Sequence, residues 1–291
     1  MRSANEKSIS RRTFLKLFGF LAPVVVFFGK IPLAFAGKWE KGKANLWTGK
    51  TFKQTNVDMG KYKNGIIRAK VNGSWADYKI QKLSNAFIEY NLKSRREGLD
   101  NIKAGRMPNI GGPHAGAVAT YGGTRLDSQV TINNAVKGIG LAPKAERIEA
   151  AMKTLKDTVE KPMPEKLDIL KSFYEDPDFV DWTKQTSLEL YTQPDFETHT
   201  FLNLMENPIS SVVFLDVPSY EIRAITRLIH PEDKSASSEE KNLLEYVNLI
   251  HSYFHGEFKI KFTLMVFHVI ELFDNSPGKM KGIRVVPGLA R

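Results

Sequence analysis

The sequence of 291 residues contains no cysteine. This absence excludes disulfide bonds, iron–sulfur clusters, covalently attached haem and metal sites built from thiolates. A metal site in this chain would have to be built from His, Asp and Glu side chains, and only six His residues are present. A flavin or a divalent metal that binds noncovalently remains compatible with this composition.

The sequence also lacks long hydrophobic runs, apart from one at residues 17–28. That run is shorter than the roughly 20 residues that a membrane-spanning helix needs. We therefore expect the chain beyond it to be soluble and to have no stable membrane span.

A short motif precedes this apolar run, with the sequence Ser10-Arg11-Arg12-Thr13-Phe14-Leu15-Lys16. The run is followed by Ala34-Phe35-Ala36, which has the small residues of a signal-peptidase cleavage site. A chance basic pair in an ordinary secretory signal is the alternative interpretation. Lys30 argues against it, because a positive charge between the apolar run and the cleavage site hinders the general secretory route.

These residues resemble a twin-arginine (Tat) signal peptide, and the resemblance covers residues 1–36. It implies that the Tat export machinery recognises Arg11, Arg12, Phe14 and Leu15. It also implies that signal peptidase reads Ala34 and Ala36 and removes the signal before Gly37. It also implies that the protein folds in the cytoplasm, with any cofactor or partner protein, before it reaches the periplasm.

The net charge gives no reason to expect a nucleic-acid partner. The chain has 42 basic and 32 acidic residues, and residues 1–36 contain six of the former and one of the latter. The remainder therefore has 36 basic and 31 acidic residues, a net charge of about +5. Nucleic-acid binding would call for a concentrated basic face with aromatic residues among the charges.

The composition along the chain predicts three segments. Residues 1–36 are the cleaved signal, residues 37–64 form an extended polar arm, and residues 65–291 form a single domain. Prolines near residues 161–164 mark either a subdivision of that domain or a simple turn between helices.

The hydrophobic patterns predict an α+β fold, with a mixed or antiparallel sheet packed against several amphipathic helices. Asn72-Gly73 predicts a hairpin between strands 66–71 and 74–80. Strands are also expected at 211–217, 221–229 and 262–273, the last buried on both faces. Helices are expected at 81–97 (closed by Gly98), 144–160, 165–174, 201–206 and from a capping box at Ser237 to Gly256.

One group of residues suggests a divalent metal site. Asp195, Glu197 and His199 alternate, so an extended segment would place them on one side. His251 and His255 are four residues apart and share one stripe of a helix. The alternative is that these histidines are structural, with His199 capping the helix at residue 201.

A second group suggests an anionic cofactor. The segment from Asn207 to Asp216, followed by a strand with Arg223 and Arg227, resembles the core hairpin of the flavin-binding split-barrel family related to pyridoxamine phosphate oxidase. The resemblance implies that these two arginines hold the cofactor phosphate. The alternative is that both arginines pair with acidic side chains.

No motif places a nucleophile or an acid–base pair, so whether the protein is an enzyme is left open. We expect a Tat-exported, soluble periplasmic protein that acts as a binding or accessory component, a role compatible with association with a redox enzyme. The alternative is an enzyme with a noncovalent cofactor, either a flavin split-barrel-like oxidoreductase or a metal enzyme with His and carboxylate ligands.

Overall fold

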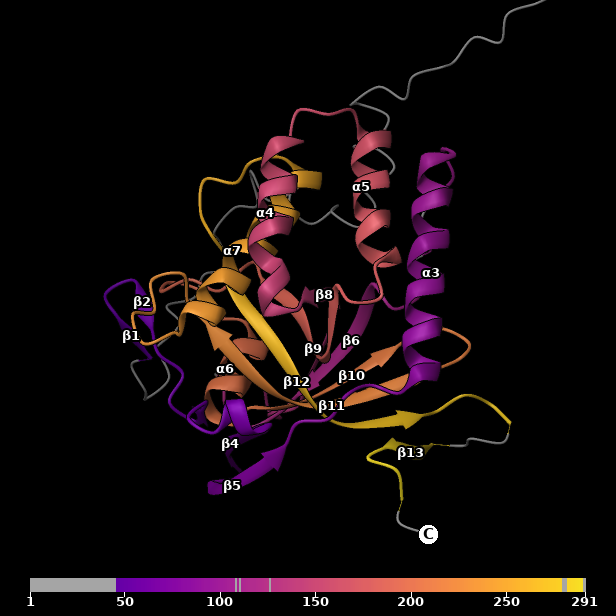
Figure 1. The fold of residues 1–291 in the computed structure, drawn as a ribbon. Coiled ribbons are helices and arrows are strands. Elements are labelled where there is room, and N and C mark those ends of the chain that lie inside the picture. The colour runs from indigo at the N-terminus through magenta and orange to yellow at the C-terminus, as the bar shows by residue number, and fades with distance from the viewer. Residues whose placement is uncertain (1–45, 108, 110, 126, 279–281, 290–291) are drawn as a thin grey trace, which may run out of the picture.

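The computed structural model describes residues 46–107, 109, 111–125, 127–278 and 282–289. The signal residues Arg11, Arg12, Phe14, Leu15, Ala34 and Ala36 lie outside this range. The described chain combines five α-helices with three antiparallel sheets, which is an α+β fold (Figure 1). None of the described helices has the length and apolar composition that crossing a bilayer requires.

The helices are α3 (Asn85–Lys103), α4 (Ile148–Asp157), α5 (Met163–Glu175), α6 (His199–Glu206) and α7 (Ser238–His255). The short strands of the N-terminal part are β1 (Trp47–Thr48), β2 (Thr51–Phe52), β3 (Val57–Asp58), β4 (Ile66–Val71) and β5 (Ser74–Lys79). The remaining strands are β6 (Ala115–Thr120), β7 (Asn133–Gly138), β8 (Gly140–Pro143), β9 (Val180–Glu189), β10 (Ile209–Phe214), β11 (Tyr220–Ile229), β12 (Thr263–Asp274) and β13 (Ile283–Val286).

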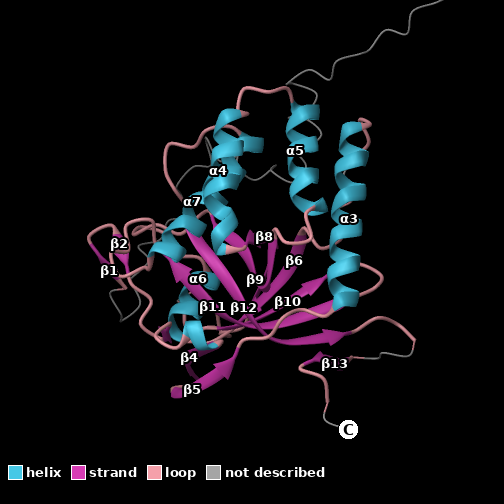
Figure 2. Ribbon diagram, in the orientation of Figure 1, coloured by secondary structure: helices cyan, strands magenta, loops and turns pink. Residues whose placement is uncertain are grey.

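The main sheet has eight antiparallel strands and curls into a half-barrel (Figure 2). Its strand order is β7-β6-β10-β11-β12-β9-β8, with β13 paired to the end of β12. The two strands at the ends of this order, β7 and β8, are consecutive in the chain and are joined by Ile139 alone. The curl therefore brings the two edges of the sheet close together.

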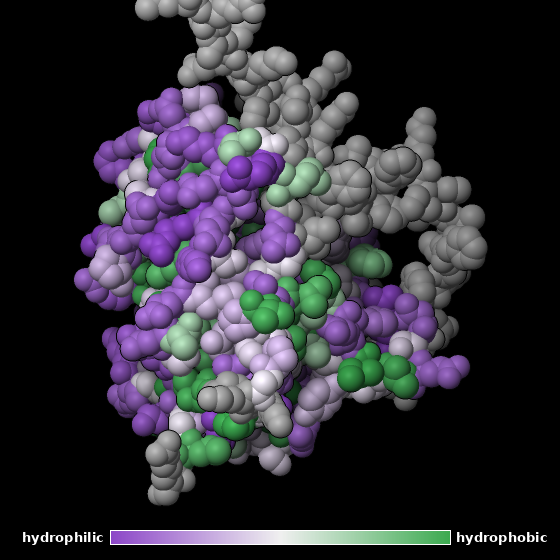
Figure 3. Space-filling model, turned by 90° about the vertical axis from the view of Figure 1, so that its right-hand side faces the viewer, coloured by the Kyte–Doolittle hydropathy of each residue, from purple (hydrophilic) through white to green (hydrophobic). Residues whose placement is uncertain are grey.

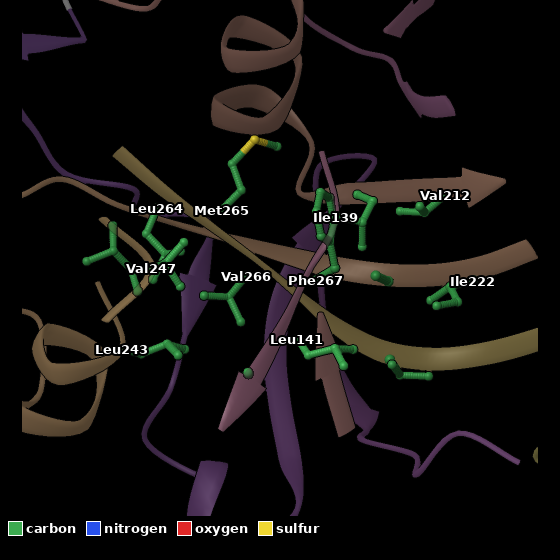
Figure 4. Packing of buried hydrophobic residues seen from close by; sticks show 14 of the residues in the cluster. Ile139, Leu141, Val212, Ile222, Leu243, Val247, Leu264, Met265, Val266 and Phe267 are labelled. Carbon is green, nitrogen blue, oxygen red and sulfur yellow. The ribbon is translucent and has the colours of Figure 1, made fainter. Parts of the chain in front are cut away.

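Buried side chains fill both sides of β12. Met265 and Phe267 face the inside of the half-barrel, where Figure 4 shows Phe267 beside Ile139. Leu264 and Val266 lie on the opposite side, next to Leu243 and Val247 of α7. The expected strand at 262–273 is confirmed and is buried on both faces, because β11 and β9 flank it and α7 covers it.

Several local predictions are also confirmed. β4 and β5 form the hairpin, and both turn residues have positive φ, 51° at Asn72 and 81° at Gly73. Ser237 and Glu240 form a capping box at the start of α7, which ends before Gly256. Of the prolines near 161–164, Pro162 is the N-cap of α5 and Pro164 lies in the first turn of that helix.

The helix expected at 81–97 differs from the observed α3. It begins after the N-cap Ser84, whose hydroxyl accepts a hydrogen bond from the Phe87 N–H. The prediction that Gly98 closes the helix is wrong, because the helix continues through Gly98 to Lys103. Gly105, with φ of 73°, follows the helix end instead.

Residues 46–64 of the expected polar arm run along the folded domain. Trp47 and Phe52 are buried and pack against Phe201 of α6. The side chains of Gln54 and Asn56 are also buried and donate hydrogen bonds to backbone carbonyls of α6. Contacts with α6 and the main sheet thus hold this segment in place.

Candidate functional site

A cleft of about 310 Å³ lies between the C-terminal halves of α5 and α7 and the strands β7, β8 and β9. Its lining is mainly apolar and aromatic: Ile139, Leu141, Leu170, Tyr174, Leu188, Leu190, Tyr246, Val247, Ile250 and Phe254. The polar side chains on its wall are His114, Thr186, Ser187, His251 and His255. A concave, mostly apolar site with a few polar groups is typical of small-molecule binding.

The helix α7 supplies one wall through its regular spacing. Tyr246, Ile250 and Phe254 recur every four residues and therefore share one face of the helix. Leu170 and Tyr174 have the same spacing on α5. The opposite wall is formed by strand residues, with Gly138–Leu141 on one side and Thr186–Leu188 on the other.

Two hydroxyl groups on the strand wall have unused hydrogen-bonding capacity. Thr186 and Ser187 are only 1% and 4% exposed, and their hydroxyl oxygens contact no hydrogen-bond partner among the described residues. Gly140 lies against Thr186, because a Cβ at this position would be 2.8 Å from Thr186 Oγ1. A side chain at position 140 would therefore crowd this part of the wall.

His114 follows a backbone segment that Arg95 of α3 binds. The Arg95 guanidinium donates to the carbonyl oxygens of Pro113 and Ile139 at 2.7 and 2.8 Å. His114 Nε2 is buried and has no partner among the described groups. Burial lowers the pKa of His114, and the nearby Arg95 cation lowers it further, so the ring is neutral at neutral pH.

His251 and His255 lie together on α7, with their ring centroids 4.7 Å apart. The His251 ring also stacks on Phe258 at 4.9 Å. Burial among these rings, together with the neighbouring His255, lowers the pKa of His251 to about 4. At neutral pH this part of the cleft therefore presents a neutral imidazole.

The other residues of the expected metal site lie elsewhere. Asp195 is in a tight turn closed by Gln193 and Phe196, so the segment is not extended as the alternation required. Glu197 accepts a hydrogen bond from the Trp47 indole at 2.8 Å. His199 begins α6 and lies 3.3 Å from Asp127, and the cap of that helix is Thr198.

His251 and His255 therefore lie together on α7. Glu197 and His199 instead contact Trp47 and Asp127. Within the described ranges, no group of three or more His, Cys, Asp or Glu side chains is arranged to hold a metal ion. The two histidines contribute to the cleft wall with His114.

Arg223 and Arg227, the expected phosphate ligands, are both paired with carboxylates. Arg223 is half-exposed and lies 3.0 Å from Glu221 and 3.8 Å from Glu271. Arg227 is buried and binds Glu240 at 2.9 Å and Asp233 at 3.3 Å. An anionic ligand at either guanidinium would have to compete with these carboxylates.

The polar residues Thr186 and Ser187 did not emerge from the sequence as site residues. They lie in β9, whose pattern is obscured because Gln185, Ser187 and Glu189 occupy alternate, buried positions. A hydrophobic alternation would have revealed this strand. The signal that could have pointed to the cleft was the stripe of His251 and His255 next to Ile250 and Phe254.

The described surface seen in Figure 3 carries hydrophobic residues in small, separate groups among hydrophilic ones. This face therefore lacks, among the described residues, the broad apolar patch that is typical of a large hydrophobic interface. In comparisons with known proteins, the chain matches no family model and no curated protein.

Proposed function

We propose that this chain is a Tat-exported binding protein that holds a small, uncharged and largely apolar molecule in the cleft between α5, α7 and β9. The observation that carries the proposal is the apolar wall of the cleft, with the unpartnered hydroxyl of Thr186 on the side of β9 that faces α7. Apolar lining supplies affinity, and a few buried polar groups fix the orientation of the ligand.

The charge of the cleft favours an uncharged ligand. His114 and His251 both have lowered pKa values and are neutral at neutral pH. An ionised ligand would lose its hydration without gaining an opposite charge from these rings, which is unfavourable. Export is supported by the sequence of residues 10–16 and 34–36, which resembles a Tat signal.

The binding proposal can be tested with N-phenyl-1-naphthylamine, an uncharged fluorescent probe. We expect saturable binding of one probe per chain. Ile250→Trp should abolish it, because the larger ring fills the cleft from α7. Lys241→Trp is the matched control, since it adds an indole to an exposed position of the same helix. Equal binding by both variants, or no saturable binding, would refute the proposal.

The same purified protein also tests the alternative of an enzyme with a noncovalent cofactor. An absorbance spectrum would reveal a flavin, and elemental analysis would reveal a stoichiometric metal. Native mass spectrometry would identify an organic ligand that remains bound from the cell. A stoichiometric flavin or metal would replace the proposal made here.

A further inference from the structure

The positive charge of the protein is concentrated in a small part of the chain. Residues 46–84 contain eight Lys or Arg residues and only two acidic residues, Asp58 and Asp77. Residues 85–291 contain 25 basic and 28 acidic residues, so their net charge is slightly negative. Residues 46–84 form β1 to β5, and they give one region of the surface a charge opposite in sign to that of residues 85–291.

The three-stranded sheet β3-β4-β5 presents cations on one face. Arg68 and Lys70 are two residues apart on β4 and therefore point to the same side. Their pairing partners on β5 are Asp77 and Trp75, which share that side. Lys79 belongs to the same side because it lies two residues beyond Asp77. All five side chains are exposed, so this side of the sheet faces the solvent.

Acidic side chains compensate only part of this charge. Asp77 binds Lys61 at 2.6 Å and lies 4.0 Å from Arg68. Asp58 of β3 lies opposite Arg68 on the same face. Four cations therefore share the face with two carboxylates. Two further lysines are exposed just before β4 and just after β5, Lys63 and Lys82. We call Lys61, Arg68, Lys70, Lys79 and Trp75 the basic face.

Contacts on the other side of the small sheet fix the orientation of the basic face. Ile67 and Ala69 alternate with the cations of β4, are fully buried and pack with Ile225 of β11. Lys184 of β9 donates a hydrogen bond to the Tyr62 hydroxyl at 2.9 Å. The small sheet is thus attached to the main sheet by apolar packing and by a polar contact, and its outer side remains free to meet a partner.

Trp75 indicates which kind of anionic partner fits this face. It is 42% exposed, and the Arg68 guanidinium lies over its ring, 5.5 Å from the centroid. Tryptophan is enriched at the interface of membranes, where its apolar ring and polar N–H lie among lipid head groups. A single-stranded nucleic acid would call for several stacking rings, whereas Trp75 is the one aromatic residue among the described side chains of this face.

We propose that the basic face docks the protein on the surface of a membrane that contains anionic phospholipids. Its cations contact the lipid phosphates, and Trp75 lies at the level of the head groups. β4 and β5 are at the bottom of Figure 1, whereas α5, which lines the cleft, is at the top. Membrane docking goes beyond the proposed binding function and can be measured independently of it.

Co-sedimentation with lipid vesicles tests the proposal on the processed protein recovered from the periplasm. We expect binding to vesicles of equal parts phosphatidylglycerol and phosphatidylcholine, little binding to pure phosphatidylcholine, and loss of binding at about 1 M NaCl, because salt screens surface charges. The double variant Arg68→Glu and Lys70→Glu should bind about 30-fold more weakly, since each cation near an anionic surface contributes a factor of about five.

The matched control changes the net charge by the same amount elsewhere. Lys153→Glu and Lys156→Glu replace two exposed lysines of α4 and should reduce the affinity for anionic vesicles less than about threefold. Circular dichroism checks that both double variants are folded. Trp75 supplies a second readout, because its emission should shift to shorter wavelength on anionic vesicles. Trp75→Phe should lack this shift, since Trp47 and Trp182 are buried.

Equal binding to the two kinds of vesicle would overturn the proposal. Equal losses in the two double variants would also overturn it, because net charge and not the basic face would then cause binding. If the protein ignores vesicles but binds poly-glutamate through Arg68 and Lys70, the partner is an acidic protein segment and the lipid proposal is wrong. In each case, binding of N-phenyl-1-naphthylamine without vesicles still reports on the cleft alone.

Discussion

Gln54 shows how a single polar side chain can complete a sheet. β10 begins at Ile209, which lies opposite Ile225 of β11. Residues 226–229 of β11 therefore extend past the end of β10. The Gln54 side chain occupies this position, where Oε1 accepts from the Leu228 N–H at 2.7 Å and Nε2 donates to the Thr226 carbonyl at 3.1 Å. It therefore replaces a neighbouring strand in the hydrogen bonding of β11.

We expect Gln54→Leu to lower the free energy of unfolding by about 1–3 kcal/mol, because the buried Leu228 N–H loses its partner. Urea denaturation followed by circular dichroism measures this change. Lys53→Leu is the control, since the neighbouring side chain is exposed and its replacement should change stability by less than about 0.5 kcal/mol. Similar stabilities for the two variants would show that Gln54 does not support the sheet.

His251 should make stability depend on pH in a defined window. Burial lowers its pKa in the folded protein to about 4, below its ordinary value of 6.5. The unfolded chain therefore binds more protons between these values, and this contribution to stability is lost as the pH falls from 6.5 toward 4. We expect the Tm of the wild type to fall more steeply across this window than that of His251→Gln.

The comparison at pH 7.5 supplies the baseline for this experiment, because the imidazole is neutral there in both states. The effect should be modest, since His251 is only partly buried. Parallel Tm profiles for the two proteins between pH 7.5 and 4.5 would contradict the assignment of a lowered pKa to this histidine.

At the scale of single elements, local signals predicted what local interactions determine. The Asn72-Gly73 turn and the Ser237–Glu240 capping box depend on residues adjacent in the sequence, and both occur as expected. β9 was not predicted, because its buried face carries Gln185, Ser187 and Glu189 instead of apolar residues. The end of α3 was misplaced because packing against α5 continues past Gly98, through Leu99 and Ile102.

The strand β12 gives the sharpest test of an element. Val266 is 2% exposed, between β11 and β9 and beneath α7. Val266→Asp buries a carboxylate without a partner and should destabilise the protein by about 4 kcal/mol or more. Val136→Asp is the matched control, because Val136 is 77% exposed on the edge strand β7. Urea unfolding of the two variants distinguishes the positions, and a cooperatively folded Val266→Asp protein of normal stability would contradict a central β12.

At the scale of the whole molecule, the sequence predicted the α+β class and an antiparallel sheet as one option, but not the arrangement of the strands. The closure of the half-barrel depends on β7 and β8 lying at opposite ends of the strand order. The pairs that create this order join residues far apart in the chain, such as Gly116 with Phe214. No local pattern encodes such pairs, so the cleft between α5, α7 and β9 was not predicted either.

The same long-range order bears on the export proposal. Gln54 near the start of the described chain contacts β11, and β12 pairs with β9, so the fold needs segments from both ends of the described residues. The resemblance to Tat signals implies that the machinery transports a protein that has already folded. Both the arginine pair and a stable sheet should therefore be necessary for export.

We expect the double variant Arg11→Lys and Arg12→Lys to remain in the cytoplasm as unprocessed precursor, because the receptor reads the guanidinium pair and not the charge alone. Arg2→Lys, outside the motif, is the control and should be exported normally. Val266→Asp should also be retained, although its signal is intact, since its sheet is destabilised. Cell fractionation with immunoblotting measures all three, and normal processing of the double variant would reject the Tat pathway. Export of an unfolded Val266→Asp chain would instead point to the general secretory route.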